Sequence, residues 1–93
     1  MALVAEYQAM VEQPAPGEWN LTCTLFWTKL HPVQVVQMLP VLSQYQCTVL
    51  TMPHPDDTMT VQASYCQTRR TYLECRADES AMVNLLLALL RLD

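Results

Sequence analysis

The residues best suited to acid–base or nucleophilic chemistry are two histidines and four cysteines, at positions His31, His54, Cys23, Cys47, Cys66 and Cys75. A cysteine nucleophile needs a base within hydrogen-bond reach and a third group that orients this base. The spacing of the six residues does not indicate such an arrangement, and His54 lies between two prolines in an expected loop. We therefore predict that the protein is not an enzyme and has no catalytic residues.

The cysteines do not indicate a metal site either. No two of them have the C-x-x-C spacing of structural zinc sites. The acidic pair Asp56–Asp57 offers too few ligands to resemble a calcium-binding EF-hand loop, so we expect no metal and no cofactor. The segment Met1–Val11 contains a glutamate and lacks the basic start of a signal peptide. We expect an intracellular protein, cytoplasmic or nuclear, with reduced and mostly buried thiols.

One basic cluster stands out in the sequence, formed by Arg69, Arg70 and Arg76. Guanidinium groups bind carboxylates and phosphates through paired hydrogen bonds. Acidic residues lie in the same stretch and offset this charge: Glu74, Asp78 and Glu79. The net charge of −4 argues against general binding to nucleic acids or anionic membranes. The arginine cluster is either a solvated edge or a contact for an anionic partner, such as a phospholipid headgroup or RNA.

The stretch Ala81–Leu92 predicts a C-terminal helix with apolar residues on two sides. One side has the i, i+3, i+4, i+7 pattern of a core-facing helix and consists of Met82, Leu85, Leu86 and Leu89. The other side consists of Val83, Leu87 and Leu90. The stretch is too short to span a membrane, which takes about 20 residues. Because a helix that is apolar all round is buried on more than one side, we predict that the second side contacts a partner.

The composition also favours an interaction surface. A chain of 93 residues is expected to form one domain. Its hydrophobic fraction is 52%, and its charged fraction is 15%, compared with about 25% charged residues in ordinary globular chains. So few charges leave apolar surface uncovered, and such surface commonly marks a site of association.

Hydrophobic periodicity divides the chain into three parts. We expect a short N-terminal helix at residues 1–13, a proline-rich linker at 14–18 and a single α+β domain at 19–93. Strict alternation from Trp19 to Trp27 predicts a half-buried strand at the start of this domain. The further predicted elements are a helix that opens at Pro32 and kinks or ends near Pro40, strands at 46–52, 58–66 and 70–76, and the C-terminal helix.

These elements predict an α+β fold with two layers. Strands joined by short connections pair as an antiparallel meander, so we expect an antiparallel sheet of about four strands. Both main helices are expected to cover one face of the sheet. The element order of the domain is strand, helix, three strands and helix.

Part of this pattern resembles a known regulatory domain. A tryptophan-bearing strand, WNLTCTLFW, leads through Leu30-His31-Pro32 into a helix of the form P-V-x-V-V-x-M-L, and YLECRADESAMVNLLLALLRL follows the predicted meander. These features resemble the C-terminal kinase-associated domain of microtubule-affinity-regulating and AMP-activated protein kinases. The resemblance implies a role in autoinhibition, subunit docking or binding of anionic phospholipid.

A second resemblance concerns the stretch from Pro32 to Leu92. The segment MLPVLSQYQCTVLTMPHP is similar to the first helix, first strand and following loop of the double-stranded-RNA-binding domain, and the predicted order is helix, three strands, helix. Where that family uses lysines to grip phosphates, this sequence has Arg76-Ala77-Asp78-Glu79-Ser80. An acidic helix start binds phosphate poorly, so this resemblance implies a degenerate member that acts as a protein-dimerisation module.

Taken together, the sequence predicts a non-enzymatic protein–protein interaction or oligomerisation domain that serves as a docking or regulatory module of a larger assembly. The expected partner is another protein or a second copy of the chain, and the expected contacts are Val83, Leu87 and Leu90. The alternative is an anion-binding module that acts on a lipid headgroup or RNA through the arginine cluster. The charge balance disfavours nucleic acid, and at membranes it allows only weak headgroup binding.

Overall fold

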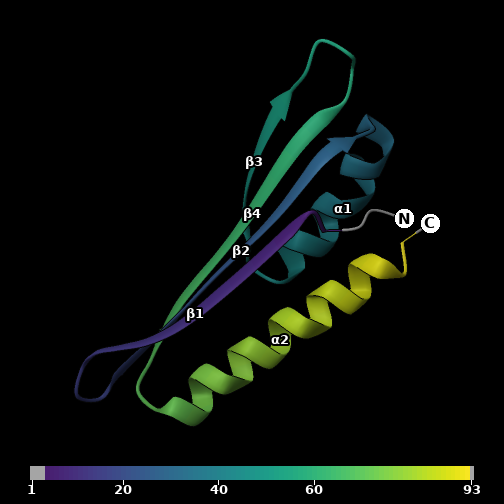
Figure 1. The fold of residues 1–93 in the computed structure, drawn as a ribbon. Coiled ribbons are helices and arrows are strands. Elements are labelled where there is room, and N and C mark those ends of the chain that lie inside the picture. Colours follow the sequence, from purple (N-terminus) through teal and green to yellow (C-terminus); the bar gives the residue numbers. More distant parts are fainter. Residues whose placement is uncertain (1–3, 93) are drawn as a thin grey trace.

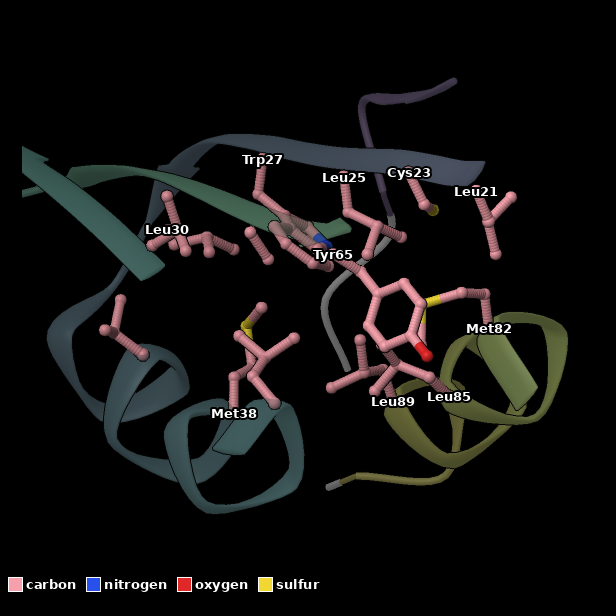
Figure 2. Close-up of a cluster of buried hydrophobic side chains, with 14 of the residues drawn as sticks. Leu21, Cys23, Leu25, Trp27, Leu30, Met38, Tyr65, Met82, Leu85 and Leu89 are labelled. Atoms are coloured by element: carbon pink, nitrogen blue, oxygen red, sulfur yellow. The ribbon is translucent and has the colours of Figure 1, made fainter. Parts of the chain in front are cut away.

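A computed structural model of the protein describes residues 4–92 and shows an α+β fold (Figure 1). Its elements are β1 (Glu6–Ala15), β2 (Glu18–Leu30), α1 (Pro32–Gln44), β3 (Thr48–Pro53), β4 (Met59–Arg69) and α2 (Tyr72–Leu90). The four strands form one antiparallel sheet in the order β1-β2-β4-β3. Both helices lie on the same face of this sheet (Figures 1 and 2). The predicted two-layer α+β fold with about four antiparallel strands is therefore confirmed.

The core lies between the sheet and the two helices. Strand β2 alternates as predicted, and its four central helix-facing side chains are fully buried: Leu21, Cys23, Leu25 and Trp27. Opposite residues of an antiparallel pair share a face, so β4 adds Val61, Ala63 and Tyr65 to the same layer. Figure 2 shows the labelled side chains of β2 and Tyr65 of β4 pointing toward the helices, which contribute Met38 of α1 and Met82, Leu85 and Leu89 of α2. Trp27 is thus part of this core.

The predicted N-terminal helix at residues 1–13 is wrong within the part of the chain that the structure describes. Residues 6–15 form the strand β1, which pairs with β2 from Glu6 opposite Phe26 to Glu12 opposite Asn20; residues 1–3 lie outside the described range. An isolated helix of this length is marginal in water, whereas the sheet supplies a backbone hydrogen-bond partner along the whole segment.

The predicted linker at 14–18 is the turn of this β1–β2 hairpin. Ala15 pairs with Glu18, which leaves Pro16 and Gly17 as the two central turn residues. Gly17 has a φ of 73°, as the third position of a type II turn requires. Proline is favoured at the second position of such a turn, which Pro16 occupies here. The four-residue turn connects two strands of one sheet.

The predicted fourth strand at 70–76 is also wrong, because helix α2 begins at Tyr72. The Thr71 hydroxyl caps the helix by accepting a hydrogen bond from the backbone N–H of Glu74 at 3.2 Å. Cys75, Asp78 and Met82 then follow at helical spacing and are all buried. Two strands, rather than three, therefore separate the two helices, and β1 supplies the fourth strand of the sheet.

Helix α1 continues through Pro40 to Gln44, so it does not end near residue 39. It closes with a Schellman motif: the N–H of Gln46 donates to the carbonyl of Ser43 at 3.0 Å, and that of Cys47 donates to Leu42 at 3.1 Å. Gln46 takes the left-handed conformation, with a φ of 63°. The chain then continues directly into β3. Strand β3 runs parallel to β2 and lies on the other side of β4.

Candidate interaction surface

Helix α2 presents two apolar sides with opposite exposure. Its inner side includes Leu85 and Leu89, which are 0% and 2% exposed. Its outer side is formed by the three residues predicted as partner contacts, and Val83, Leu87 and Leu90 are 47%, 46% and 42% exposed. We call these three residues the α2 stripe. The spacing of four and three residues along the helix places them in one row.

Two residues of the α2 stripe, Val83 and Leu90, lie on the side of the helix toward β1. Helix α2 packs on β2 and β4, whereas α1 packs on β3 and β4, so the side of α2 away from α1 faces the β1 end of the sheet (Figure 1). Burial, the Cys23 thiol and the Glu79 carboxylate raise the pKa of Tyr7 on β1, in keeping with Glu79 on this side of α2. Val83 and Leu90 follow Glu79 by four and eleven residues and so stand on the same side of the helix. The Tyr72 ring, which precedes Glu79 by two helical turns, contacts the Trp19 ring of β2 with the centroids 5.0 Å apart.

The opposite side of α2 points toward β4 and α1. Asp78 is 8% exposed and accepts two hydrogen bonds from the guanidinium group of Arg69 on β4, at 2.8 and 2.9 Å. Ala81 lines a small cleft together with Gln44 and Tyr45 at the end of α1. Because these contacts occupy that side, Val83 and Leu90 face away from α1 and toward the β1 edge, whereas Leu87, two residues from both Leu85 and Leu89, points away from the sheet.

Strand β1 forms an edge of the sheet, as the strand order requires. An edge strand carries a row of backbone N–H and C=O groups without ladder partners, and it can pair with a further strand. The register places Tyr7, Ala9 and Val11 on the helix-facing side, and it places Gln8 and Met10 on the other face of the sheet. Tyr7 is 38% exposed and Met10 is 54% exposed. The edge of β1 and the α2 stripe are therefore neighbours, and we refer to them jointly as the β1/α2 surface.

The arginine cluster is largely paired within the protein. Arg69 binds Asp78, and this carboxylate raises the pKa of the guanidinium group further. Arg76 forms an ion pair with Glu79 at 3.1 Å and donates a hydrogen bond to the Tyr72 hydroxyl at 2.9 Å. Arg70 is exposed and has no ion pair among residues 4–92. The structure thus leaves one arginine of the three available to an anion without breaking an internal pair.

The histidines and cysteines lie in separate places. His31 precedes the first turn of α1, and its backbone N–H donates to the Gln34 side chain at 2.9 Å. His54 lies between β3 and β4 and shares a hydrogen bond with the Thr60 hydroxyl. All four cysteines carry free thiols. Burial raises the pKa of Cys47 to about 11, so this thiol is protonated near neutral pH and is a poor nucleophile.

Residues 4–92 contain no group of three or more histidine, cysteine, aspartate or glutamate side chains placed to hold a metal ion. Within the same range, neither helix is both long and apolar enough to cross a membrane.

A second exposed apolar area lies on the sheet face away from the helices. The register brings Phe26 of β2 and Leu50 of β3 to opposite sides of Gln62 on β4. Leu50 is 64% exposed and Met52 is 57% exposed, and together with Phe26 they line a hollow of about 300 Å³. These residues were not among the contacts predicted from the sequence. Alternation along β3 could have placed Leu50 and Met52 on one face.

The edge of β1 was missed for a related reason. Tyr7, Ala9 and Val11 alternate with Gln8 and Met10, which is a strand pattern that the helical interpretation of this segment concealed. Comparisons with models of known protein families, with curated proteins and with solved structures give no match. The two resemblances described above therefore stay predictions.

Proposed function

We propose that the protein is a non-enzymatic interaction module that self-associates through the β1/α2 surface. The observation that supports this proposal most directly is the α2 stripe, three apolar side chains that are 42–47% exposed on a helix whose other side is fully buried. Single exposed apolar residues are common in soluble proteins, but contiguous ones mark association sites. The neighbouring edge of β1 enlarges the area that a partner can cover.

The chemistry of the stripe favours a second copy of the chain. From Ser80 to Leu90 the helix carries no charged side chain. Two copies can therefore bring these segments together without like-charge repulsion, even though each chain has a net charge of −4. Twofold symmetric dimers are the most common oligomers, and they require a patch that fits itself. An uncharged apolar row meets that requirement.

The energy available from the stripe is moderate. Full burial of a valine or leucine side chain stabilises by about 1.5–3 kcal/mol, and about half of this remains to be gained at each of the three positions. Six such side chains, three from each copy, contribute on the order of several kcal/mol before the costs of association. The arginine cluster supports the alternative anion-binding function less well, because Arg69 and Arg76 already bind carboxylates.

Light scattering across a concentration series tests this proposal. We expect the wild-type protein to reach the mass of a dimer and the Leu87→Glu/Leu90→Glu variant to stay a monomer with an unchanged circular dichroism spectrum. Burying the introduced carboxylates against a second copy would be too costly. A wild-type protein that remains a monomer at all concentrations contradicts the proposal.

The matched control is Val33→Glu/Val36→Glu on α1. These valines are 68% and 67% exposed, so the control adds the same charge to another helical surface of the same layer. It should leave the dimer intact. Equal dissociation of both double variants would show that net charge, rather than the α2 stripe, controls association, and the proposal would be wrong.

A further inference from the structure

We propose that the second copy pairs with the chain through β1, antiparallel across a twofold axis, with Met10 opposite Met10 of the partner copy. The result is a continuous sheet of eight strands. This inference rests on the proposed self-association and specifies how it is achieved.

A stable interface contains more residues than the α2 stripe supplies. Specific protein interfaces bury about 800 Å² per partner and involve about 20–30 residues on each side. The α2 stripe supplies three residues. Strand β1 borders it and adds ten residues, Glu6–Ala15, together with their unpaired backbone groups. Three and ten residues together remain below that number, so both elements must contribute to a stable dimer.

The two edges of the sheet differ in how they are protected against pairing. The other edge, β3, has six residues and ends at Pro53, and short length and proline are two devices that prevent edge-to-edge pairing. Strand β1 is longer, carries no lysine or arginine and has no proline before Pro14. Edge pairing is therefore disfavoured at β3 and is open along residues 6–12 of β1, before its register irregularity and Pro14.

Symmetry and charge narrow the choice of register, and we propose the one centred on Met10. A twofold axis perpendicular to the sheet keeps each residue on its own face, and directly opposite residues share a face, so the axis must pass through a residue. An axis through Ala9 would place Glu6 opposite Glu12, and like charges directly opposite are destabilising. An axis through Met10 places Gln8 opposite Glu12, where the side-chain amide can donate to the carboxylate.

A register centred on Met10 also uses the helix-facing side of β1. It places Ala9 of each copy opposite Val11 of the other copy. These residues lie on the helix-facing side of the joined sheet, between the α2 helices of the two copies. Because Val83 and Leu90 stand on the side of α2 that borders β1, pairing of the strands brings the two α2 stripes toward each other. The stripes then cover the helix-facing side of the joined β1 strands, including the partly exposed Tyr7.

Cysteine cross-linking tests both the strand and the register. In an antiparallel pair the Cβ atoms of opposite residues are about 4.5–5.5 Å apart, close enough for a disulfide after a small adjustment. In a Cys66→Ser background, which removes the exposed native thiol, we expect Met10→Cys to form a disulfide-linked dimer under mild oxidation. Gln8→Cys and Ala9→Cys, placed two residues and one residue away, are the matched controls and should cross-link at least tenfold less.

A second measurement does not depend on disulfide geometry. Amide hydrogen exchange along β1 should be slow at successive residues in the wild-type dimer. In Leu87→Glu/Leu90→Glu, where β1 is a free edge, exchange should be fast at alternate residues. Cross-linking at Gln8→Cys or Ala9→Cys in place of Met10→Cys overturns the inference.

The two proposals fail in different ways. A wild-type dimer whose β1 amides exchange like those of the monomeric variant overturns the strand pairing but leaves self-association through α2 standing. A wild-type monomer overturns both. The mass and the exchange pattern therefore identify which step is wrong.

Discussion

The two sides of helix α2 have almost the same residue types and opposite surroundings. Leu85 and Leu89 on the inner side are 0% and 2% exposed, whereas Leu87 and Leu90 on the outer side are 46% and 42% exposed. The sheet and α1 cover the first pair, and nothing within residues 4–92 fully covers the second. Leucine therefore serves stability on one side and remains available for association on the other. The difference lies in packing and cannot be read from composition.

The largest difference between the two sides of α2 is expected from a pair of leucine-to-alanine substitutions. Leu85→Ala should lower the free energy of unfolding by about 2–5 kcal/mol, because it removes buried methyl groups and leaves a cavity. Leu87→Ala should lower it by about 1 kcal/mol or less, since the site is half exposed. Urea unfolding at a protein concentration low enough to keep the chain monomeric measures both values. Equal losses of unfolding free energy would mean that the two sides of α2 contribute equally to stability.

A smaller effect is expected from the ion pair on the inner side. Asp78→Ala leaves the guanidinium group of Arg69 without the carboxylate that now accepts its two hydrogen bonds. Hydrogen bonds to charged groups contribute about 1.5–3 kcal/mol, and we expect a loss in this range by thermal or urea unfolding.

The Arg76–Glu79 pair is the matched control for this prediction. Its side chains are 56% and 32% exposed, compared with 37% and 11% for Arg69 and Asp78. Exposed pairs contribute about 0.2–1 kcal/mol, so Glu79→Ala should cost less than Asp78→Ala. The reverse order would show that burial does not set the strength of these two pairs.

The sequence was sufficient for the parts of the fold where one periodicity dominates. Alternation from Trp19 to Trp27 identified β2, and the 3–4 spacing of Met82, Leu85 and Leu89 identified the core-facing side of α2. Both segments are buried on one side only, so the hydrophobic pattern reports the packing directly.

The two errors occurred where a second pattern competed. In residues 4–12 apolar side chains fit both a helical and a strand period, and only the pairing of β1 with β2 decides between them. At the start of α2, the buried Asp78 interrupts the apolar row, so its helical period was hidden. The T-x-x-E sequence from Thr71 to Glu74 is a helix N-cap signal that could have identified this start.

The predicted contact residues illustrate a further limit. The sequence indicated that Val83, Leu87 and Leu90 form a second apolar side, and the structure places all three on one exposed row. The neighbourhood of that row could not be foreseen, because it depends on β1 being a strand at the sheet edge. A helix at the N-terminus would have given the stripe a different neighbour.

The smallest expected effect concerns the thiols of the inner layer. Burial, with contributions from the Asp78 and Glu79 carboxylates, raises the pKa of Cys75 on the inner side of α2 above its ordinary value of 9.0. Burial also raises the pKa of Cys47 to about 11. As the pH rises above about 9, the unfolded chain releases these protons while the folded chain keeps them. The folded state then binds more protons than the unfolded state, so the free energy of unfolding falls as the pH rises toward about 11.

Urea unfolding under reducing conditions, at several values between about pH 8 and pH 11, measures this slope. Cys75→Ala should make the decline shallower, because it removes one of the groups that titrate differently in the two states. Cys66→Ala, at an exposed position, is the matched control and should keep the wild-type slope. An inner-side variant whose slope equals that of Cys66→Ala would mean that Cys75 is as accessible to water as an outer residue. The contrast between the two sides of α2 would then not extend to its first turn.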